Sequence, residues 1–450
     1  MSSEYYAPGK VVVELTADAN SIVSEYITDT VEAGAYTAFG IEVVDGALSW
    51  LSVESITRLY AAVEPYDVDP DLLASMLATY VIRFPEDTDV DGVVSELMAL
   101  AEVVNAEPVG LCELAVTTAN DPRLVDQWGL DAIKAPLAWD RQKGTDNIKV
   151  TVIDTGCDSN HPDLAPRLGT SLRGKGWDFC ENPTCYGGER RVGDYTSPDD
   201  DPQDENGHGT GMAGIIGAAT DNGIGIAGVT WGCRLFAARV ACRTELPGGG
   251  VGAACNSDEM AKAIQWAGEW SHVANISMVN LYGDNKHVRD AVNYALQAKT
   301  TVVAAMGNDN SNILRYPAAY PGVIAVGAIN KLGYQWVAGP SKGSNTGNHM
   351  SVSAPGSKIA TLDLYSTWGS PQYTEATGTS PAAAFVSGVV ALLYSCNVGI
   401  TPRQVKQILE ETASHVVPDP WTWPNSVYGN GIVDAKAAVD RVLDGPMPPP

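Results

Sequence analysis

One stretch, residues 376–393, constrains the fold of this 450-residue chain more than any other. It opens with a Gly-Thr-Ser-Pro turn at 378–381 and continues with small and apolar residues. Proline costs no hydrogen bond in the first turn of a helix, so the stretch predicts a buried helix that begins at Ser380. Free N–H groups and the positive end of the helix dipole would lie beside the Ser380 hydroxyl. That suits a nucleophile whose substrate develops negative charge, although a serine capping a core helix would look the same.

Length and charge narrow the class of protein. The chain is long enough for two or three domains, and 45% hydrophobic residues, 18% charged residues and 45 glycines are typical of a globular α/β protein. A formal net charge of −26 argues against partners such as nucleic acid or an anionic membrane. The acidity fits calcium sites, a saline habitat or simple solubility, and composition does not choose among these.

The N-terminus carries neither the positive region nor the apolar region of a signal peptide, and no apolar run reaches transmembrane length. We therefore expect no membrane partner. The compartment is left open: the protein is cytoplasmic, or this chain lacks its export signal.

Eight cysteines give mixed evidence. Cys180 and Cys185 bracket a short polar loop and can pair, as can Cys242 and Cys255. The other four lie in apolar or small-residue surroundings, where reduced thiols are normal: Cys112, Cys157, Cys233 and Cys396. No Cys/His spacing resembles a zinc site.

The first part of the chain predicts a small α+β unit. Its pattern indicates strands at 9–15, 80–84 and 103–109 and a helix at 87–100. The mixed helical pattern of 17–79 stays unassigned.

The rest of the chain alternates strands with helices. Strands are predicted at 148–153, 234–240, 273–276, 301–305 and 323–326, and helices at 257–267 and 288–298. This predicts an α/β fold with a mostly parallel sheet, helices on both faces and a site at the carboxyl ends of the strands. Residues 441–450 end in a proline-rich run and are predicted to be a disordered tail.

Three polar residues stand where such a site would form. Asp154 directly follows the strand at 148–153, and His208 lies between glycines in an Asn-Gly-His-Gly-Thr-Gly segment. Asn308 ends the strand at 301–305. Taken singly, each is more often a turn, surface or core residue.

Together, in the order Asp154, His208 and Ser380 with Asn308 before the serine, these residues resemble the subtilisin-like serine protease family. The resemblance covers about residues 117 to 440, with further matching motifs at 133–139, 222–229, 316–327 and 428–434. It implies a three-layer α/β fold and a serine endopeptidase that acts on proteins or peptides through an acyl-enzyme. His208 would be the general base, Asp154 would orient it, and Asn308 and the Ser380 N–H would bind the oxyanion.

The resemblance also implies a set of substrate-binding residues: Ser277, Met278, Val279, Ala305, Gly307, Asp309 and Arg315. Val279 stands where the family usually has glycine, and Pro381 and Gly211 also depart from the family motifs. Arg315 falls at the base of the first specificity pocket, with Asp309 on its rim. A free Arg315 would favour an acidic residue before the scissile bond, whereas an Arg315–Asp309 pair would leave a preference for small or medium apolar residues. We expect the pair.

A structural calcium site is implied by the same resemblance. The matching residues supply carboxylate, amide and backbone oxygens: Asp121, Asp163, Thr220, Asn222, Ile224 and Ile226. The alternative is an ordinary Asx-rich turn. The acidic run 199–205 is a second calcium candidate, and its alternative is a solvated loop.

Residues 9 to about 116 resemble the family's propeptide, which templates folding and inhibits until it is cleaved. This gives three regions: a propeptide-like region at 1–116, a catalytic domain at 117–440 and the tail at 441–450. Self-cleavage is expected between Leu114 and Asn120, in a stretch of small residues. Two alternatives stay open, a processing protease with one precursor substrate and an inactive member that serves as a binding module.

Overall fold

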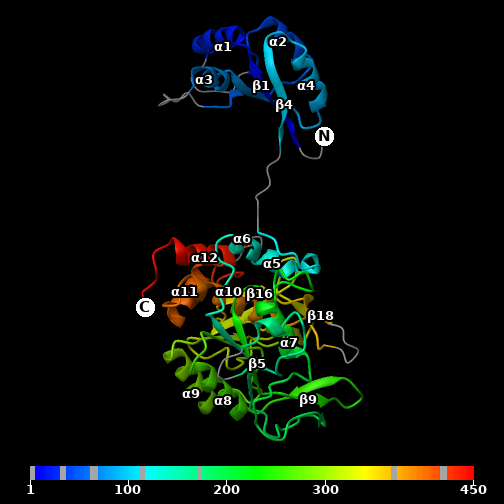
Figure 1. The fold of residues 1–450 in the computed structure, drawn as a ribbon, viewed down its shortest axis with the longest axis vertical. Helices are drawn as coiled ribbons and strands as arrows, with labels where there is room; N and C mark the ends of the chain where they lie inside the picture. Colours follow the sequence, from blue (N-terminus) through cyan, green and yellow to red (C-terminus); the bar gives the residue numbers. More distant parts are fainter. Residues whose placement is uncertain are drawn as a thin grey trace. The chain divides into compact units, whose positions relative to one another are not determined.

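The computed structural model describes residues 6–30, 37–60, 69–110, 117–169, 174–365, 372–415 and 423–449. The chain divides into two compact units, Met1–Ala115 and Val116–Pro450 (Figure 1).

The first unit is an antiparallel sheet of order β2-β3-β1-β4 with helices packed on it. Its strands are β1 (Tyr6–Leu15), β2 (Ser55–Arg58), β3 (Thr79–Arg83) and β4 (Val103–Gly110), and its helices are α1 (Ala17–Thr30), α2 (Glu42–Ala47), α3 (Pro70–Leu77) and α4 (Val90–Met98). Val11 and Val13 are buried because alternate residues of β1 face the helices. The three predicted strands and the predicted helix are present. The unassigned stretch 17–79 supplies β2 and α1 to α3, and its Phe39 and Ile56 join the same core.

The second unit is built on a seven-stranded sheet of order β16-β13-β12-β11-β5-β8-β6. Every neighbouring pair in it is parallel. The strands are β5 (Lys149–Asp154), β6 (Gly176–Asp178), β8 (Arg234–Arg239), β11 (Val273–Ile276), β12 (Thr301–Ala305), β13 (Ile324–Ile329) and β16 (Val352–Pro355). The predicted α/β fold with a parallel sheet is confirmed.

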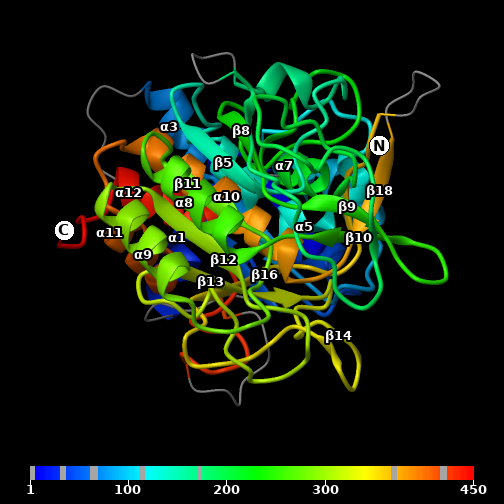
Figure 2. The same ribbon diagram turned by 90° about the horizontal axis from the view of Figure 1, so that it is seen from below.

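Helices cover both faces of this sheet because its strands are apolar on both sides. Val150 and Val152 of β5 face a core shared with α7 (His208–Gly217), α10 (Thr379–Cys396), α11 (Pro402–Thr412) and α12 (Ala435–Leu443). Ile153 faces the opposite core, formed with α8 (Ser257–Gly268) and α9 (Lys286–Gln297). Figure 2 shows α8 and α9, in green, alongside β11 and β12.

Helix α10 is the centre of the larger core. Among the described residues it is the one helix long and apolar enough to cross a membrane, but 89% of that window is buried inside the protein, as in a core helix. Its small residues permit this burial. A Cβ on Gly388 would lie 2.5 Å from the Cβ of Val229, so only glycine allows this approach.

Shorter elements surround the sheet. They are helices α5 (Trp128–Ala132) and α6 (Ala135–Trp139), the three-stranded sheet of β7 (Arg190–Arg191), β9 (Cys242–Glu245) and β10 (Val251–Ala254), and the hairpins of β14 (Val337–Gly339) with β15 (Lys342–Gly343) and β17 (Ile359–Leu362) with β18 (Tyr373–Ala376).

Neither of the two possible cysteine pairs is formed. All cysteines in the described part of the chain are free, and Cys112 lies outside it. Cys242 stands opposite Ala254 in the β9–β10 ladder and packs with Cys180, while Cys185 packs against this cluster. Cys255, directly after the end of β10, packs against the core that contains Ile153 and not against the cluster of Cys180 and Cys242.

The tail differs from the predicted disorder. Residues 441–443 belong to α12, and Met447 packs against the core. The buried Gln404 side chain donates a hydrogen bond from Nε2 to the Pro448 carbonyl at 2.6 Å. The tail is therefore held in place by α11.

Candidate active site

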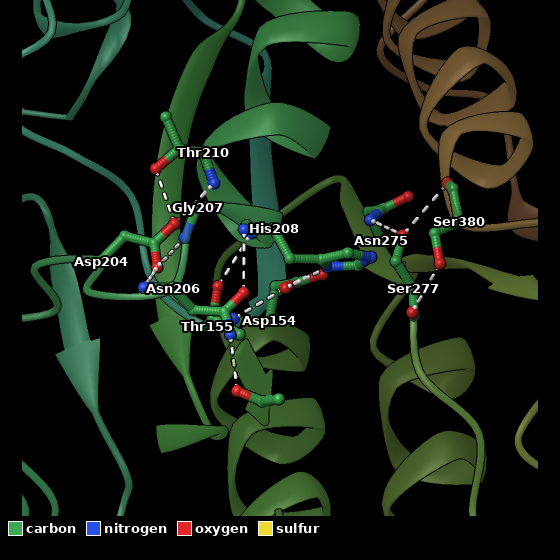
Figure 3. A network of polar contacts seen from close by, with 12 residues as sticks. Asp154, Thr155, Asp204, Asn206, Gly207, His208, Thr210, Asn275, Ser277 and Ser380 are labelled. Carbon is green, nitrogen blue, oxygen red and sulfur yellow. Dashed lines mark hydrogen bonds and ion pairs between the residues drawn. The ribbon is translucent and has the colours of Figure 1, made fainter. Parts of the chain in front are cut away.

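The predicted catalytic residues meet at the carboxyl edge of the parallel sheet, where such folds collect their sites. Asp154 ends β5, His208 begins α7, and Ser380 is the second residue of α10. The three residues line one cleft of ≈ 1230 Å³. His208 Nδ1 lies 2.7 Å from Asp154 Oδ1, and Figure 3 shows the imidazole between this carboxylate and the side of the cleft that carries Ser380.

Asp154 is fully buried and accepts a second hydrogen bond from the Thr155 N–H at 2.8 Å. Burial alone would lower the pKa of His208, but attraction and hydrogen bonding to Asp154 outweigh it, so the pKa of His208 is raised above its usual 6.5. The Asp154 carboxylate therefore fixes the imidazole and favours its protonated form.

The turn that presents His208 is held by Asp204, a residue that sequence reasoning placed in the calcium candidate 199–205. Its buried carboxylate accepts from the N–H groups of Asn206 (2.8 Å) and Gly207 (3.0 Å) and from the Thr210 N–H (2.9 Å) and hydroxyl (2.7 Å). Gly207 has φ 101°, which only glycine adopts easily. The role of Asp204 is thus to cap the histidine helix.

The Ser380 hydroxyl donates to the Ser277 carbonyl at 3.0 Å rather than to His208. The Ser277 hydroxyl in turn donates to the Ser380 carbonyl at 3.2 Å and accepts from Asn275 Nδ2 at 3.0 Å. Ser387, two turns further along α10, donates to Asn275 Oδ1 at 2.9 Å. This network ties the start of α10 to the end of β11.

Asn308 lines the cleft. Its Oδ1 accepts from both the N–H and the hydroxyl of Thr379, each at 2.9 Å. Because these bonds occupy the oxygen, the Nδ2 donor is the part of the amide left for a ligand. Sequence reasoning missed this role of Thr379, and its place directly before Ser380 was the available signal.

Six of the seven predicted substrate-binding residues line the cleft: Ser277, Met278, Val279, Ala305, Gly307 and Asp309. Arg315 does not line it but lies against Asp309, with Nε–Oδ2 at 2.9 Å and Nη2–Oδ1 at 3.0 Å. This pairing lowers the pKa of Asp309. The expected Arg315–Asp309 pair is thus present. Arg315, expected at the base of the pocket, is a half-buried side chain that holds Asp309 in place.

Exposed apolar side chains also line the cleft, although sequence reasoning did not select them: Tyr186, Val251, Leu281 and Tyr282. They belong to β10 and to loops, which lack the periodicity that makes a core residue recognisable.

The predicted calcium residues come together around two buried carboxylates. Asp163 accepts from Asn222 Nδ2 at 2.8 Å and from the Ile226 N–H at 2.9 Å, and Asp121 accepts from the Asp221 N–H at 2.8 Å. Burial raises the pKa of Asp163 to about 6, and the nearby Asp121 charge adds to this. The Thr220 hydroxyl accepts from the Gly228 N–H, so Thr220 offers its carbonyl.

These residues fit a calcium ion. A Cβ on Gly225 would lie 2.1 Å from Asp163 Oδ2, so the loop closes tightly on the carboxylate only because residue 225 is glycine. Carboxylate, amide and carbonyl oxygens are the ligands that calcium takes. The carbonyl oxygens would come from Thr220, Ile224 and Ile226.

The second calcium candidate does not fit in the same way. Asp199 is the one residue of 199–205 in a group with Asp178 and Asp194, whose carboxylates lie within 4.8 Å of one another. A buried guanidinium from Arg239 already pairs with Asp178 there and donates to Glu205 at 3.0 Å. The chain's own guanidinium therefore already takes up part of the negative charge of this cluster.

A parallel-sheet fold with an aspartate–histidine pair and a serine at a helix N-terminus in one cleft defines a serine protease. The model of the Subtilase family matches residues 145–436, and the chain belongs to this family. It is a serine endopeptidase of the subtilisin-like class, as the sequence predicted.

Three known proteins illustrate the similarity. Thermitase from Thermoactinomyces vulgaris is 34% identical over 324 residues, which cover 72% of this chain and 99% of thermitase. The structure of a protease from Pseudoalteromonas arctica PAMC 21717 has a TM-score of 0.61 at 28% identity and covers 72% of this chain and 100% of its own. Fervidolysin from Fervidobacterium pennivorans has a TM-score of 0.55 at 22% identity, covers 100% of this chain and 62% of its own, and supports the fold alone.

Proposed function

We propose that this endopeptidase hydrolyses peptide bonds through an acyl-enzyme on Ser380, with His208 as general base and Asp154 as its orienting carboxylate. The observation that carries the proposal is the 2.7 Å contact between His208 Nδ1 and Asp154 in the cleft that Ser380 lines. This contact leaves Nε2 as the nitrogen that can take a proton from the nucleophile.

The reaction begins when the Ser380 hydroxyl turns from Ser277 to His208. As Ser380 Oγ attacks the peptide carbonyl, its proton passes to His208 Nε2, and Asp154 stabilises the imidazolium. Asn308 Nδ2 and the Ser380 N–H at the start of α10 donate to the oxyanion. His208 then gives the proton to the leaving amine, and water, activated by the same imidazole, hydrolyses the acyl-enzyme.

A calcium ion is the second part of the proposal. Asp121, Asp163 and Asn222 would hold it, together with the carbonyl oxygens of Thr220, Ile224 and Ile226. When bound, the ion supplies positive charge to two buried carboxylates that otherwise repel each other. Its role is structural, because Asp163 is not among the residues that line the catalytic cleft.

The first unit is proposed to be an inhibitory propeptide that is cut away between Leu114 and Asn120. Its own core of buried residues, including Val11, Phe39 and Leu97, supports a unit that folds compactly. Residues 111–116, in which part of this junction falls, lie outside the described residues.

Active-site labelling tests the function. A fluorophosphonate probe should label the mature enzyme and fail to label Ser380→Ala. Ser395→Ala is the matched control, because Ser395 lies on the same helix and donates only to the Ala391 carbonyl. Labelling of Ser380→Ala at the parent level would refute the nucleophile, and absence of labelling in the mature parent would favour a binding module. Cleavage of denatured casein then separates a broad protease from a processing enzyme.

A further inference from the structure

The hydroxyl of Tyr373 is buried and makes no hydrogen bond of normal geometry with another described residue. Leaving a buried donor unpaired costs about 1–3 kcal/mol, so such a group has a reason to be there. Tyr373 lies on β18, four residues before Thr377 and seven before the nucleophile Ser380.

The Tyr373 hydroxyl faces the calcium site. The position of a Cβ on Gly225 would be 2.2 Å from this hydroxyl and 2.1 Å from Asp163 Oδ2. The two oxygens therefore lie beside the same glycine, separated by no more than the sum of these two distances.

Neighbouring side chains hold the Tyr373 ring in this direction. The His161 ring packs edge to face against it, with centroids 5.5 Å apart, and the Arg123 guanidinium lies 5.2 Å from its centroid. His161 Nε2 is also 3.1 Å from the carbonyl of Gln372, the preceding residue. A ring fixed in this way cannot turn its hydroxyl to solvent at low cost.

We propose that the Tyr373 hydroxyl donates to the Asp163 carboxylate in the calcium-bound enzyme, which makes Tyr373 the positioning residue that couples the calcium site to the strand leading to Ser380. The inference rests on the calcium site proposed above and is independent of the peptidase chemistry. Asp163 accepts two hydrogen bonds already, and a carboxylate has room for further donors and for a cation. A phenol has an ordinary pKa of about 10, so it keeps its proton at neutral pH and remains a donor.

Groups that orient a metal ligand affect metal affinity. Loss of such a partner typically weakens binding by about 10-fold to 100-fold. Through β18, the same contact would link calcium occupancy to the backbone near the nucleophile. The Gly378 N–H donates to the Gly356 carbonyl at 2.8 Å, and the Lys358 N–H donates to the Thr377 hydroxyl at 2.9 Å. These bonds hold the end of that strand in place.

The test uses the full chain in a Ser380→Ala background, which prevents self-digestion. Calcium is titrated calorimetrically into chelator-treated Tyr373→Phe and its parent. We expect the dissociation constant to rise about 10-fold to 100-fold in Tyr373→Phe, with an unchanged circular dichroism spectrum in excess calcium. Phenylalanine keeps the ring contacts with His161 and Arg123, so the fold should be retained.

Tyr394→Phe is the matched control. Its hydroxyl is 2.8 Å from the Thr301 hydroxyl at the amino end of β12, and burial raises the pKa of Tyr394 to about 12. This variant should lose thermal stability and keep the parent calcium affinity. An unchanged affinity in Tyr373→Phe overturns the inference, as does an equal loss in both variants. A parent that binds no calcium also overturns it, while the labelling result with Ser380→Ala would still stand.

Discussion

The Arg315 guanidinium donates two hydrogen bonds to the Asp309 carboxylate, from Nε to Oδ2 at 2.9 Å and from Nη2 to Oδ1 at 3.0 Å. Asn345 Nδ2 donates a third to the same carboxylate at 3.0 Å. The Arg315 charge is thus neutralised by a carboxylate that lines the cleft. The Gly307 backbone packs closely against Arg315, since a Cβ on Gly307 would lie 3.1 Å from Arg315 Cγ. The rim of the pocket therefore offers a substrate no unpaired positive charge.

We predict that the enzyme prefers small or medium apolar residues before the scissile bond, and that Asp309→Ala shifts the preference toward Glu and Asp. The substitution frees a guanidinium that can bind a carboxylate in a bidentate manner. A peptide-library profile measures this preference. The double variant Asp309→Ala, Arg315→Ala is the control and should not gain the acidic preference. A parent profile led by Phe or Tyr would contradict the pocket argument.

The pH dependence of kcat/KM should reflect the contact between His208 and Asp154. Because the pKa of His208 is raised above 6.5 and the base must be neutral, kcat/KM should increase with pH through a midpoint above 6.5. Asp154→Asn should lower that midpoint and reduce kcat by on the order of 10⁴-fold. The pair stabilises the folded state below pH 6.5, and this contribution is lost as the pH rises through the raised pKa. A midpoint that does not move in Asp154→Asn would argue against the coupling.

Removal of an oxyanion donor should lower kcat far more than it changes KM. Asn308→Ala should lower kcat by roughly 10²-fold to 10³-fold with a much smaller change in KM, because the oxyanion exists only after attack. Thr379→Val removes one of the two bonds that orient Asn308 and should give a smaller loss in kcat. Steady-state kinetics with one peptide substrate measures both. A rise in KM with unchanged kcat in Asn308→Ala would assign that residue to ground-state binding instead.

Chelation should lower the melting temperature at pH 7, because an ion bound only to the folded state contributes about 2.7 kcal/mol at a hundred times its Kd. Without calcium, the raised pKa of Asp163, about 6, means that the folded state holds an extra proton between the usual 3.8 and about 6. Stability without calcium therefore falls as the pH rises through this window, so chelation should matter more at pH 7 than at pH 5. Melting curves in the Ser380→Ala background measure this. Curves that coincide with and without chelator would exclude a stabilising ion.

Maturation should yield a new N-terminus between Leu114 and Asn120. Self-cleavage requires the nucleophile, so Ser380→Ala should keep the full chain, whereas Ser395→Ala should mature as the parent does. N-terminal sequencing of purified protein decides this. A fully active enzyme that retains Met1 would remove the zymogen proposal.

Local sequence alone determined much of the catalytic arrangement. Asp154 follows an apolar strand, and Ser380 opens a helix of small residues, and both features are encoded within a few neighbouring residues. Parallel strands place their carboxyl ends at one edge, so the apolar pattern predicted where Asp154 and Asn308 would lie. The grouping of Asp154 with His208 and Ser380 came from the resemblance to the subtilisin-like family. The candidate calcium residues came from the same resemblance, and three of them, Asn222, Ile224 and Ile226, share one short loop.

The tertiary structure decided the partners of the charged and polar side chains. Asp204, predicted as a calcium candidate, caps the His208 helix, and Arg239, 35 residues further on, supplies the cation of the neighbouring acidic cluster. The fold brings the Tyr373 hydroxyl and the Asp163 carboxylate to the same glycine, Gly225, across 210 positions of sequence. Hydrophobic periodicity records which face of an element is buried, whereas the partner of a buried polar group depends on which distant loops the fold brings together. That information is spread over the whole chain, so no local pattern contains it.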